Sequence, residues 1–277
     1  MQKGGETVAT RSKKKQRQEL RRGLAALVVI LAGLVALGVM MVRMPTAQTP
    51  VATTILPPNP YDETDFQYEG KYLTCLSGPS VLGIDVSSHQ QTIDWQQVAD
   101  AGVEFAMIRV GYRGYESGLL NVDPKAQENY LGAKAAGLRV GAYFFSQAVT
   151  EQEAVEEAEF VLEQIAAWQV DMPVVFDWEF VNDAARTEEM EGVDITACIH
   201  AFNERIAEAG YKPMVYFNPH MARNILDLEQ LVEYPFWLAL YSDRMTFEYK
   251  VDMWQYTQEG KVPGITGNVD INLWLAE

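Results

Sequence analysis

Short apolar runs alternate with helical patterns from Val81 to the end of the chain, and glycine follows most of the helical patterns. The expected helices are 95–101, 123–136, 151–168, 195–209 and 221–232, and the expected strands are 81–86, 105–110, 138–145, 173–179, 213–217, 236–241, 252–256 and 268–273. A repeated strand-then-helix order is typical of parallel βαβ units. The sequence therefore predicts an α/β fold, a modified (β/α) TIM-like barrel that loses helices toward its C-terminal strands.

The stretch Pro173–Glu179 ends an apolar run with two acids, Asp177 and Glu179. Residues two apart in a strand point to the same face, about 6.5–7 Å apart along the chain. Two neighbouring carboxylates raise each other's pKa, so they suit an acid and a partner in different protonation states. The alternative is a pair of solvated charges where the strand enters a loop. The spacing alone leaves both interpretations open.

Other polar and aromatic residues also fall at strand ends, where barrels of this type carry their active sites. Carboxylates among Tyr and Trp are typical of a carbohydrate cleft, because aromatic faces stack on sugar rings and carboxylates assist glycosidic cleavage. His89, His200 and His220 are too scattered to form a ligand motif, so we expect no metal and no cofactor. The candidate carboxylates are Asp85, Asp177, Glu179 and Asp270, and the candidate substrate-binding residues are Tyr143, Tyr216, Trp237, Tyr241, Trp254 and Gln255. Ser146 and Asn218 also follow strands.

Charge is distributed unevenly along the chain. Residues 1–22 carry a net charge of +6, so the total of -16 leaves -22 for the rest. An acidic body of this kind is a poor partner for phosphate backbones, so nucleic-acid binding is not expected. No glycine-rich nucleotide-binding motif is present either.

An uncharged run, Leu24–Val42, follows the basic segment. Its 19 residues would span about 28 Å as a helix, close to the roughly 30 Å hydrocarbon core. We expect residues 1–23 to be a cytoplasmic basic tail and 24–42 an uncleaved single-pass anchor, with the acidic body outside the cell. A cleaved signal peptide and secretion are the alternative, although such apolar cores are normally shorter.

Residues 43–80 combine a Pro/Thr-rich spacer with a polar-aromatic extension that could pack on the domain. The catalytic domain is expected over 81–277. Cys75 and Cys198 could form one disulfide outside the cell or stay as buried thiols, and the sequence leaves this open. It also leaves the oligomeric state open.

Several ordered blocks within 81–277 resemble the lysozymes of glycoside hydrolase family 25. The blocks are Gly83–Ser87 with His89-Gln90, Ile93–Trp95, Phe105–Gly111, Val140–Phe145, Pro173–Glu179, Trp254–Thr257, Gly264-Ile265 and Val269–Asn272. The chain departs from that pattern at Gln91, where the family often has glycine, and at Phe144 or Phe145, where some members have histidine.

The resemblance implies cleavage of the β-1,4 bond between N-acetylmuramic acid and N-acetylglucosamine in peptidoglycan, with retention. It implies Glu179 as the general acid/base, Asp177, Asp85 and Asp270 as the other cleft carboxylates, and the substrate's 2-acetamido group as nucleophile. The expected partners are thus a peptidoglycan glycan strand and, through 24–42, the membrane, which favours remodelling of the producer's own wall. The alternatives are another substrate-assisted hexosaminidase or chitinase, a tethered glycan-binding module, and a structural partner in a wall-remodelling complex.

Overall fold

The computed structural model describes residues 55–181, 185–188 and 190–275. The expected tail and anchor, residues 1–42, lie outside this part of the chain. Across the described stretches, no helix combines the length and the apolar character that crossing a membrane requires.

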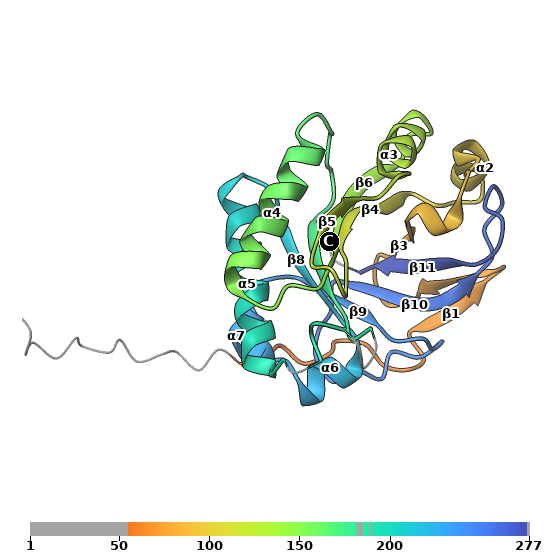
Figure 1. Cartoon of the computed structure of the whole chain (residues 1–277). Coiled ribbons are helices and arrows are strands. Elements are labelled where there is room, and N and C mark those ends of the chain that lie inside the picture. The colour runs from red at the N-terminus through yellow and green to blue at the C-terminus, as the bar shows by residue number, and fades with distance from the viewer. Residues whose placement is uncertain (1–54, 182–184, 189, 276–277) are drawn as a thin grey trace, which may run out of the picture. The chain divides into compact units, whose positions relative to one another are not determined.

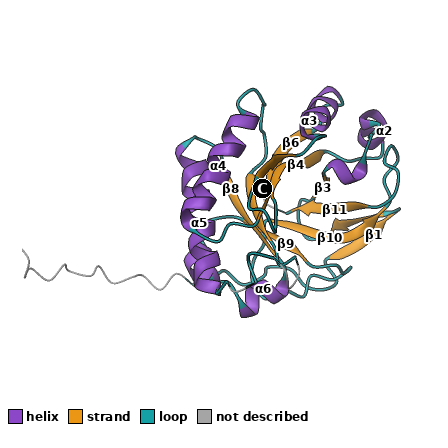
Figure 2. Cartoon of the chain, in the orientation of Figure 1, coloured by secondary structure: helices purple, strands orange, loops and turns teal. Residues whose placement is uncertain are grey.

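Eight strands close into a barrel, with the helices on its outside (Figures 1 and 2). Around the barrel the order is β3-β11-β10-β9-β8-β7-β6-β4, and pairing of β3 with β4 closes the ring. The strands are β3 (Val81–Val86), β4 (Phe105–Arg113), β6 (Arg139–Ser146), β7 (Val174–Trp178), β8 (Pro213–Phe217), β9 (Phe236–Ala239), β10 (Met253–Gly260) and β11 (Val269–Trp274). The barrel predicted from the alternating pattern is confirmed.

The last strand departs from the parallel arrangement that the βαβ pattern predicts. Strand β11 runs antiparallel to both of its neighbours, β10 and β3, while the other neighbouring pairs of the ring are parallel. The physical reason is the connection between β10 and β11, which is too short for a crossover helix.

The outer helices match the expected ones apart from shifts of a few residues at several ends and one expected helix that is divided in two. They are α2 (Trp95–Asp100), α3 (Ala126–Ala135), α4 (Glu151–Ile165), α5 (Gly192–Glu208), α6 (Pro219–Asn224) and α7 (Leu228–Leu231). The expected helix 221–232 is therefore two short helices, and Asn218 caps the first by accepting from the backbone N–H groups of His220 and Met221. Strand β4 continues beyond Val110 because β5 (Leu120–Val122) pairs with it.

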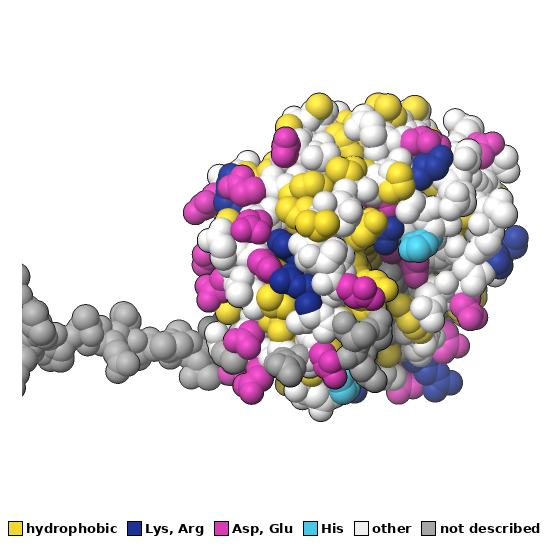
Figure 3. All heavy atoms as spheres, viewed as in Figure 1, with side chains coloured by type: hydrophobic (Ala, Val, Ile, Leu, Met, Phe, Trp, Pro, Cys, Tyr) yellow, Lys and Arg dark blue, Asp and Glu magenta, His cyan; other side chains and the backbone are white. Residues whose placement is uncertain are grey.

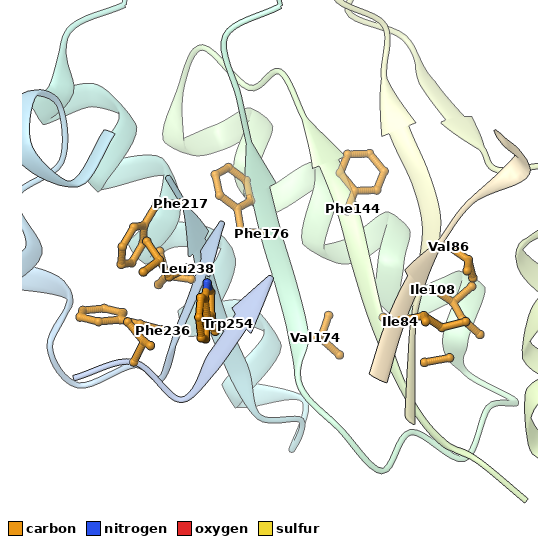
Figure 4. Packing of buried hydrophobic residues seen from close by; sticks show 14 of the residues in the cluster. Ile84, Val86, Ile108, Phe144, Val174, Phe176, Phe217, Phe236, Leu238 and Trp254 are labelled. Atoms are coloured by element: carbon orange, nitrogen blue, oxygen red, sulfur yellow. The ribbon is translucent and has the colours of Figure 1, made fainter. Parts of the chain in front are cut away.

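Side chains alternate along the barrel strands between two clusters. The outward cluster packs between strands and helices, and Figure 4 shows members of it, among them Ile84, Phe144, Phe176 and Leu238. The inward cluster fills the barrel and consists of Phe105, Met107, Tyr143, Met172, Val175, Met214, Tyr216, Trp237, Ala239 and Met253. This layer closes the barrel interior beneath the carboxyl ends of the strands.

An N-terminal hairpin, β1 (Phe66–Glu69) with β2 (Tyr72–Cys75), covers part of the barrel wall at β10. The Phe66 ring meets the Trp254 ring edge-on at 5.0 Å between centroids. The backbone N–H of Leu73 donates to the Tyr256 hydroxyl at 3.4 Å. The extension thus belongs to the same compact unit as the barrel.

Both cysteines, Cys75 and Cys198, are buried free thiols. Acidic side chains outnumber basic ones on the face shown in Figure 3, in keeping with the net charge of the body. Within the described residues, no group of three or more His, Cys, Asp or Glu side chains is arranged to hold a metal ion.

Candidate active site

A cleft of about 270 Å³ opens at the carboxyl ends of the barrel strands. Its lining holds all four predicted carboxylates and five of the six predicted substrate-binding residues. A larger hollow of about 730 Å³ lies on the outer surface between α4, α5 and α7, and none of the predicted site residues lines it. The described residues that line the cleft are Asp85, Ser87, His89, Gln90, Arg109, Tyr143, Phe145, Asp177, Glu179, Tyr216, Trp237, Tyr241, Gln255, Gln258 and Asp270.

Asp177 and Glu179 lie on one face at the end of β7, and their carboxyl groups share a hydrogen bond. Burial, followed by the charge of Glu179, raises the pKa of Asp177 well above its usual range. Burial also raises the pKa of Glu179, and the hydrogen bond from Asp177 opposes that rise. Asp177 is buried and Glu179 is half-buried. The raised pKa values make the pair a candidate proton donor, and Glu179 is its more accessible member.

Asp85 and Asp270 face each other in register on β3 and β11. Asp85 Oδ2 accepts from the Gln255 amide at 2.8 Å and from the Asn272 amide at 2.9 Å. Burial raises the pKa of Asp85 to about 6 in spite of these two donors. Burial, then the charge of Asp85, raises the pKa of Asp270 to about 8. The pKa of Asp270 therefore lies above that of Asp85, so Asp270 keeps its proton to the higher pH.

An aromatic wall forms the side of the cleft made by β8 and β9. The Tyr216 and Tyr241 hydroxyls both donate to Gln255 Oε1, at 3.2 and 3.1 Å. Tyr216 meets Trp237 edge-on with centroids 4.9 Å apart, and Tyr241 is half exposed. Gln255 thereby links the aromatic wall to Asp85, and Tyr241 offers its ring to a ligand.

Trp254 was expected in the cleft, and that prediction is wrong. It is fully buried on the outer side of β10, where its indole N–H donates to the Leu240 carbonyl at 2.7 Å and its ring packs on Phe66. Neighbouring residues in a strand face opposite sides, so Gln255 and Trp254 cannot both enter the cleft. Ser146 and Asn218 also point elsewhere: Ser146 accepts from the Ala148 backbone N–H, and Asn218 is a helix cap.

The sequence interpretation missed several residues that shape the site. Asn272 lies two residues after Asp270, and its Oδ1 accepts from the Trp237 indole at 2.8 Å. Arg109 follows the inward residues Phe105 and Met107 at alternate positions of β4. Strand alternation could have revealed both of these. Alternation could not have revealed Gln147, because it acts through a contact between two strand ends. Its side-chain amide donates to the backbone carbonyl of Glu179 at 2.8 Å.

A sequence profile described as "Glycosyl hydrolases family 25" matches residues 84–265, more than half of the chain. The chain belongs to glycosyl hydrolases family 25. The expected glycoside hydrolase class is thereby confirmed. The family 25 enzyme is also similar to the uncharacterized protein YegX of Escherichia coli O6:H1, at 31% identity over 207 residues and 70% of each chain. It is similar to Lysozyme M1 of Streptomyces globisporus, at 26% identity over 91% of this chain and 92% of that protein.

Solved structures agree with the barrel. The modular autolysin LytC from Streptococcus pneumoniae superposes with a TM-score of 0.63 at 26% identity, over 70% of this family 25 chain. The match covers 46% of the LytC chain, so the family 25 enzyme spans about half the length of that protein. The bacterial lysozyme from Streptomyces coelicolor superposes with a TM-score of 0.57 at 26% identity, over 69% of this chain and 90% of that one.

Proposed function

We propose that the protein is a peptidoglycan hydrolase, an N-acetylmuramidase that cleaves the β-1,4 bond between N-acetylmuramic acid and N-acetylglucosamine. The observation that carries this proposal is the buried Asp177–Glu179 acid pair, which faces Asp85, Asp270 and an aromatic wall in one cleft. Family membership and the lysozymes among the relatives support the same substrate.

In this proposal the proton held by the acid pair drives the first step. Glu179, the half-buried member, passes that proton to the leaving oxygen of the scissile bond. Asp177 is then left as a carboxylate, and Glu179 later takes a proton from the incoming water. A raised pKa suits this role, because a general acid must keep its proton near neutral pH.

Retention with the substrate's own 2-acetamido group as nucleophile is part of the proposal. Two-carboxylate mechanisms separate their acids by about 5–5.5 Å for retention or 6.5–9.5 Å for inversion. Asp177 and Glu179 share a hydrogen bond, so the two carboxyl groups lie side by side and not on opposite sides of a sugar. Asp177 Oδ1 is buried and has no partner among the described residues. An acetamido N–H would satisfy this oxygen, and the carboxylate would stabilise the developing oxazolinium ion.

We also propose that the enzyme acts close to its own membrane. The support is the basic segment 1–22 followed by the uncharged run 24–42 and the proline-rich spacer. A tethered enzyme of this kind remodels the producer's wall. Full-length chain in membrane fractions is the expected result, and a shortened chain in the medium would contradict the tether and indicate the secreted alternative.

The activity is tested by mass spectrometry of the muropeptides that the full-length chain releases from purified cell walls. Glu179→Gln should lower their release by about 10²–10⁴-fold, the range for a general acid. Glu163→Gln, the same change at an exposed position of α4, is the matched control and should leave activity unchanged. Release from Glu179→Gln at the wild-type rate would refute the assignment, and products from chitin alone would indicate a chitinase.

The stereochemical part has its own test. Proton NMR of the first products should show the β-anomer, and a trifluoroacetamido substrate should react more slowly because its carbonyl is a weaker nucleophile. First products of the α-anomer would exclude retention.

A further inference from the structure

Arg109 is the one Lys or Arg among the described residues that line the cleft. It projects from β4 after the inward residues Phe105 and Met107, and its side chain is 14% exposed. A guanidinium that is this deeply buried needs a negatively charged partner to offset its desolvation. To bind a ligand, it also needs an N–H group that the protein does not already use. The structure provides both.

A buried carboxylate, Asp123, holds the guanidinium in place. Arg109 Nε donates to Asp123 Oδ2 at 2.9 Å, and Nη2 lies 2.8 Å from the same oxygen. Asp123 is itself fixed, since it accepts from the backbone N–H groups of Ser88 at 3.0 Å and Lys125 at 2.8 Å. Arg109 Nη2 also donates to the Ser88 hydroxyl at 3.3 Å.

The remaining nitrogen of this group, Arg109 Nη1, has no hydrogen-bond partner within the described residues. The side chain is therefore oriented through Nε and Nη2, and its two Nη1 hydrogens remain for a ligand. Guanidinium groups form strong charge-assisted hydrogen bonds with carboxylates.

The barrel order places this cation opposite the aromatic wall. In the closed ring of eight strands, β4 lies across from β9, which carries Trp237, and β3 lies across from β8, which carries Tyr216. A sugar bound in the cleft would therefore lie between the aromatic wall and the β3–β4 side, which carries Arg109.

We propose that Arg109 binds the carboxyl group of the lactyl substituent at O3 of the muramic acid unit, and so selects muramyl glycans over plain N-acetylglucosamine polymers. The inference rests on the proposed muramidase function. The two sugars differ in that 3-O-carboxyalkyl group, and an anionic group in an otherwise acidic cleft needs a cation to receive it. In the intact wall the lactyl carbonyl oxygen, still a hydrogen-bond acceptor, takes the same place.

The test compares two glycans that differ at the lactyl carboxyl. One is a peptide-free glycan strand with the free carboxylate, and the other is the same strand with that group reduced to the alcohol. The full-length wild-type chain should show a kcat/KM about tenfold higher for the carboxylate strand, the size of one hydrogen bond to a charged group. Arg109→Met should abolish this ratio by lowering kcat/KM for the carboxylate strand alone.

Two further variants separate recognition from structure. Arg109→Lys keeps a cation and should keep part of the ratio. Lys125→Met removes a neighbouring cation that does not line the cleft, so it should leave the ratio unchanged. Equal loss on both strands in Arg109→Met would make Arg109 a structural anchor of the β3–α2 loop and would overturn the proposal, as would a wild-type ratio of one.

Binding of the same two strands to the Glu179→Gln chain, measured by titration calorimetry, decides the question without turnover. A tighter Kd for the carboxylate strand that Arg109→Met removes supports the inference, and equal Kd values refute it. A wild-type chain that cleaves no peptidoglycan would refute the proposed function, while this binding ratio would still report on Arg109.

Discussion

Gln91 has a backbone conformation that glycine favours, and replacing it with glycine should stabilise the protein. Its φ of 56° and ψ of -122° make it the one non-glycine residue with positive φ in the described part of the chain. It follows the short 3₁₀ helix η1 (Ser88–Gln90), in the loop after β3. The resemblance identifies this position as one where the family often has glycine, and the backbone angles supply the physical reason.

The magnitude follows from three contributions. Strain at a non-glycine residue in this region costs about 1–3 kcal/mol, which Gln91→Gly would remove. Glycine makes the unfolded chain more flexible, at about 0.5–1 kcal/mol. The exposed hydrogen bond from the Gln91 amide to the Ser88 carbonyl, 2.9 Å long, would also be lost, at about 0.5 kcal/mol. The expected net gain is about 1 kcal/mol, or roughly 2–4 °C in Tm.

Urea unfolding of the full-length chain, followed by tryptophan fluorescence, measures this gain. Gln91→Ala is the matched control, because it loses the side-chain hydrogen bond but keeps the Cβ and hence the strain. We expect the order of stability to be glycine, then wild type, then alanine. A glycine variant no more stable than the alanine variant would refute the strain argument.

Three further predictions follow from the site and its surroundings. Gln147→Met removes the amide that donates to the Glu179 carbonyl, so kcat on peptidoglycan should fall about tenfold at unchanged KM, and a KM effect alone would contradict this positioning role. The difference in Tm between Asp270→Asn and wild type should shift in favour of the variant as the pH rises. Burial raises the pKa of Asp270 from its usual 3.8 to about 8. The neutral Asp270 side chain therefore contributes its full stabilisation of the folded wild-type protein below pH 3.8, and this contribution is lost as the pH rises through 8. A Tm difference that stays constant over this pH range would refute the prediction. Trp254→Ala should lower the free energy of unfolding by about 3–5 kcal/mol, because the buried Trp254 ring packs against Phe66. A rise in KM with unchanged stability would instead indicate that Trp254 contacts the substrate.

Periodicity carried most of the fold prediction. Buried strands such as Val174–Trp178 and Pro213–Phe217 are short apolar runs bounded by turn residues, and the sequence shows them plainly. The antiparallel direction of Val269–Trp274 was missed, because direction depends on the length of a connection and on barrel closure. The break near Ile225 was missed because the helical pattern of 221–232 looks continuous.

The candidate site was predictable where each residue depends on its own strand end. Asp177 and Glu179 share a face by simple alternation, and alternation would also have excluded Trp254 and included Asn272. Gln147 could not have been found this way. Its role arises because Glu179 lies one residue beyond the β6–β7 ladder, which ends at Trp178, so a side chain supplies the next hydrogen bond.

Four carboxyl groups in one buried cleft would repel one another strongly if all were ionised. The structure reduces that cost by dividing the protons unequally. Burial raises the pKa of both Asp85 and Asp270. Asp85, which receives two amide donors, has the lower pKa, about 6, and Asp270 has the higher, about 8. Burial also raises the pKa of Asp177 and of Glu179, which favours a proton on this pair. A cleft that divides its protons in this way suits the proposed glycosidic cleavage, which needs a proton for the leaving oxygen and a negative charge beside the cationic transition state.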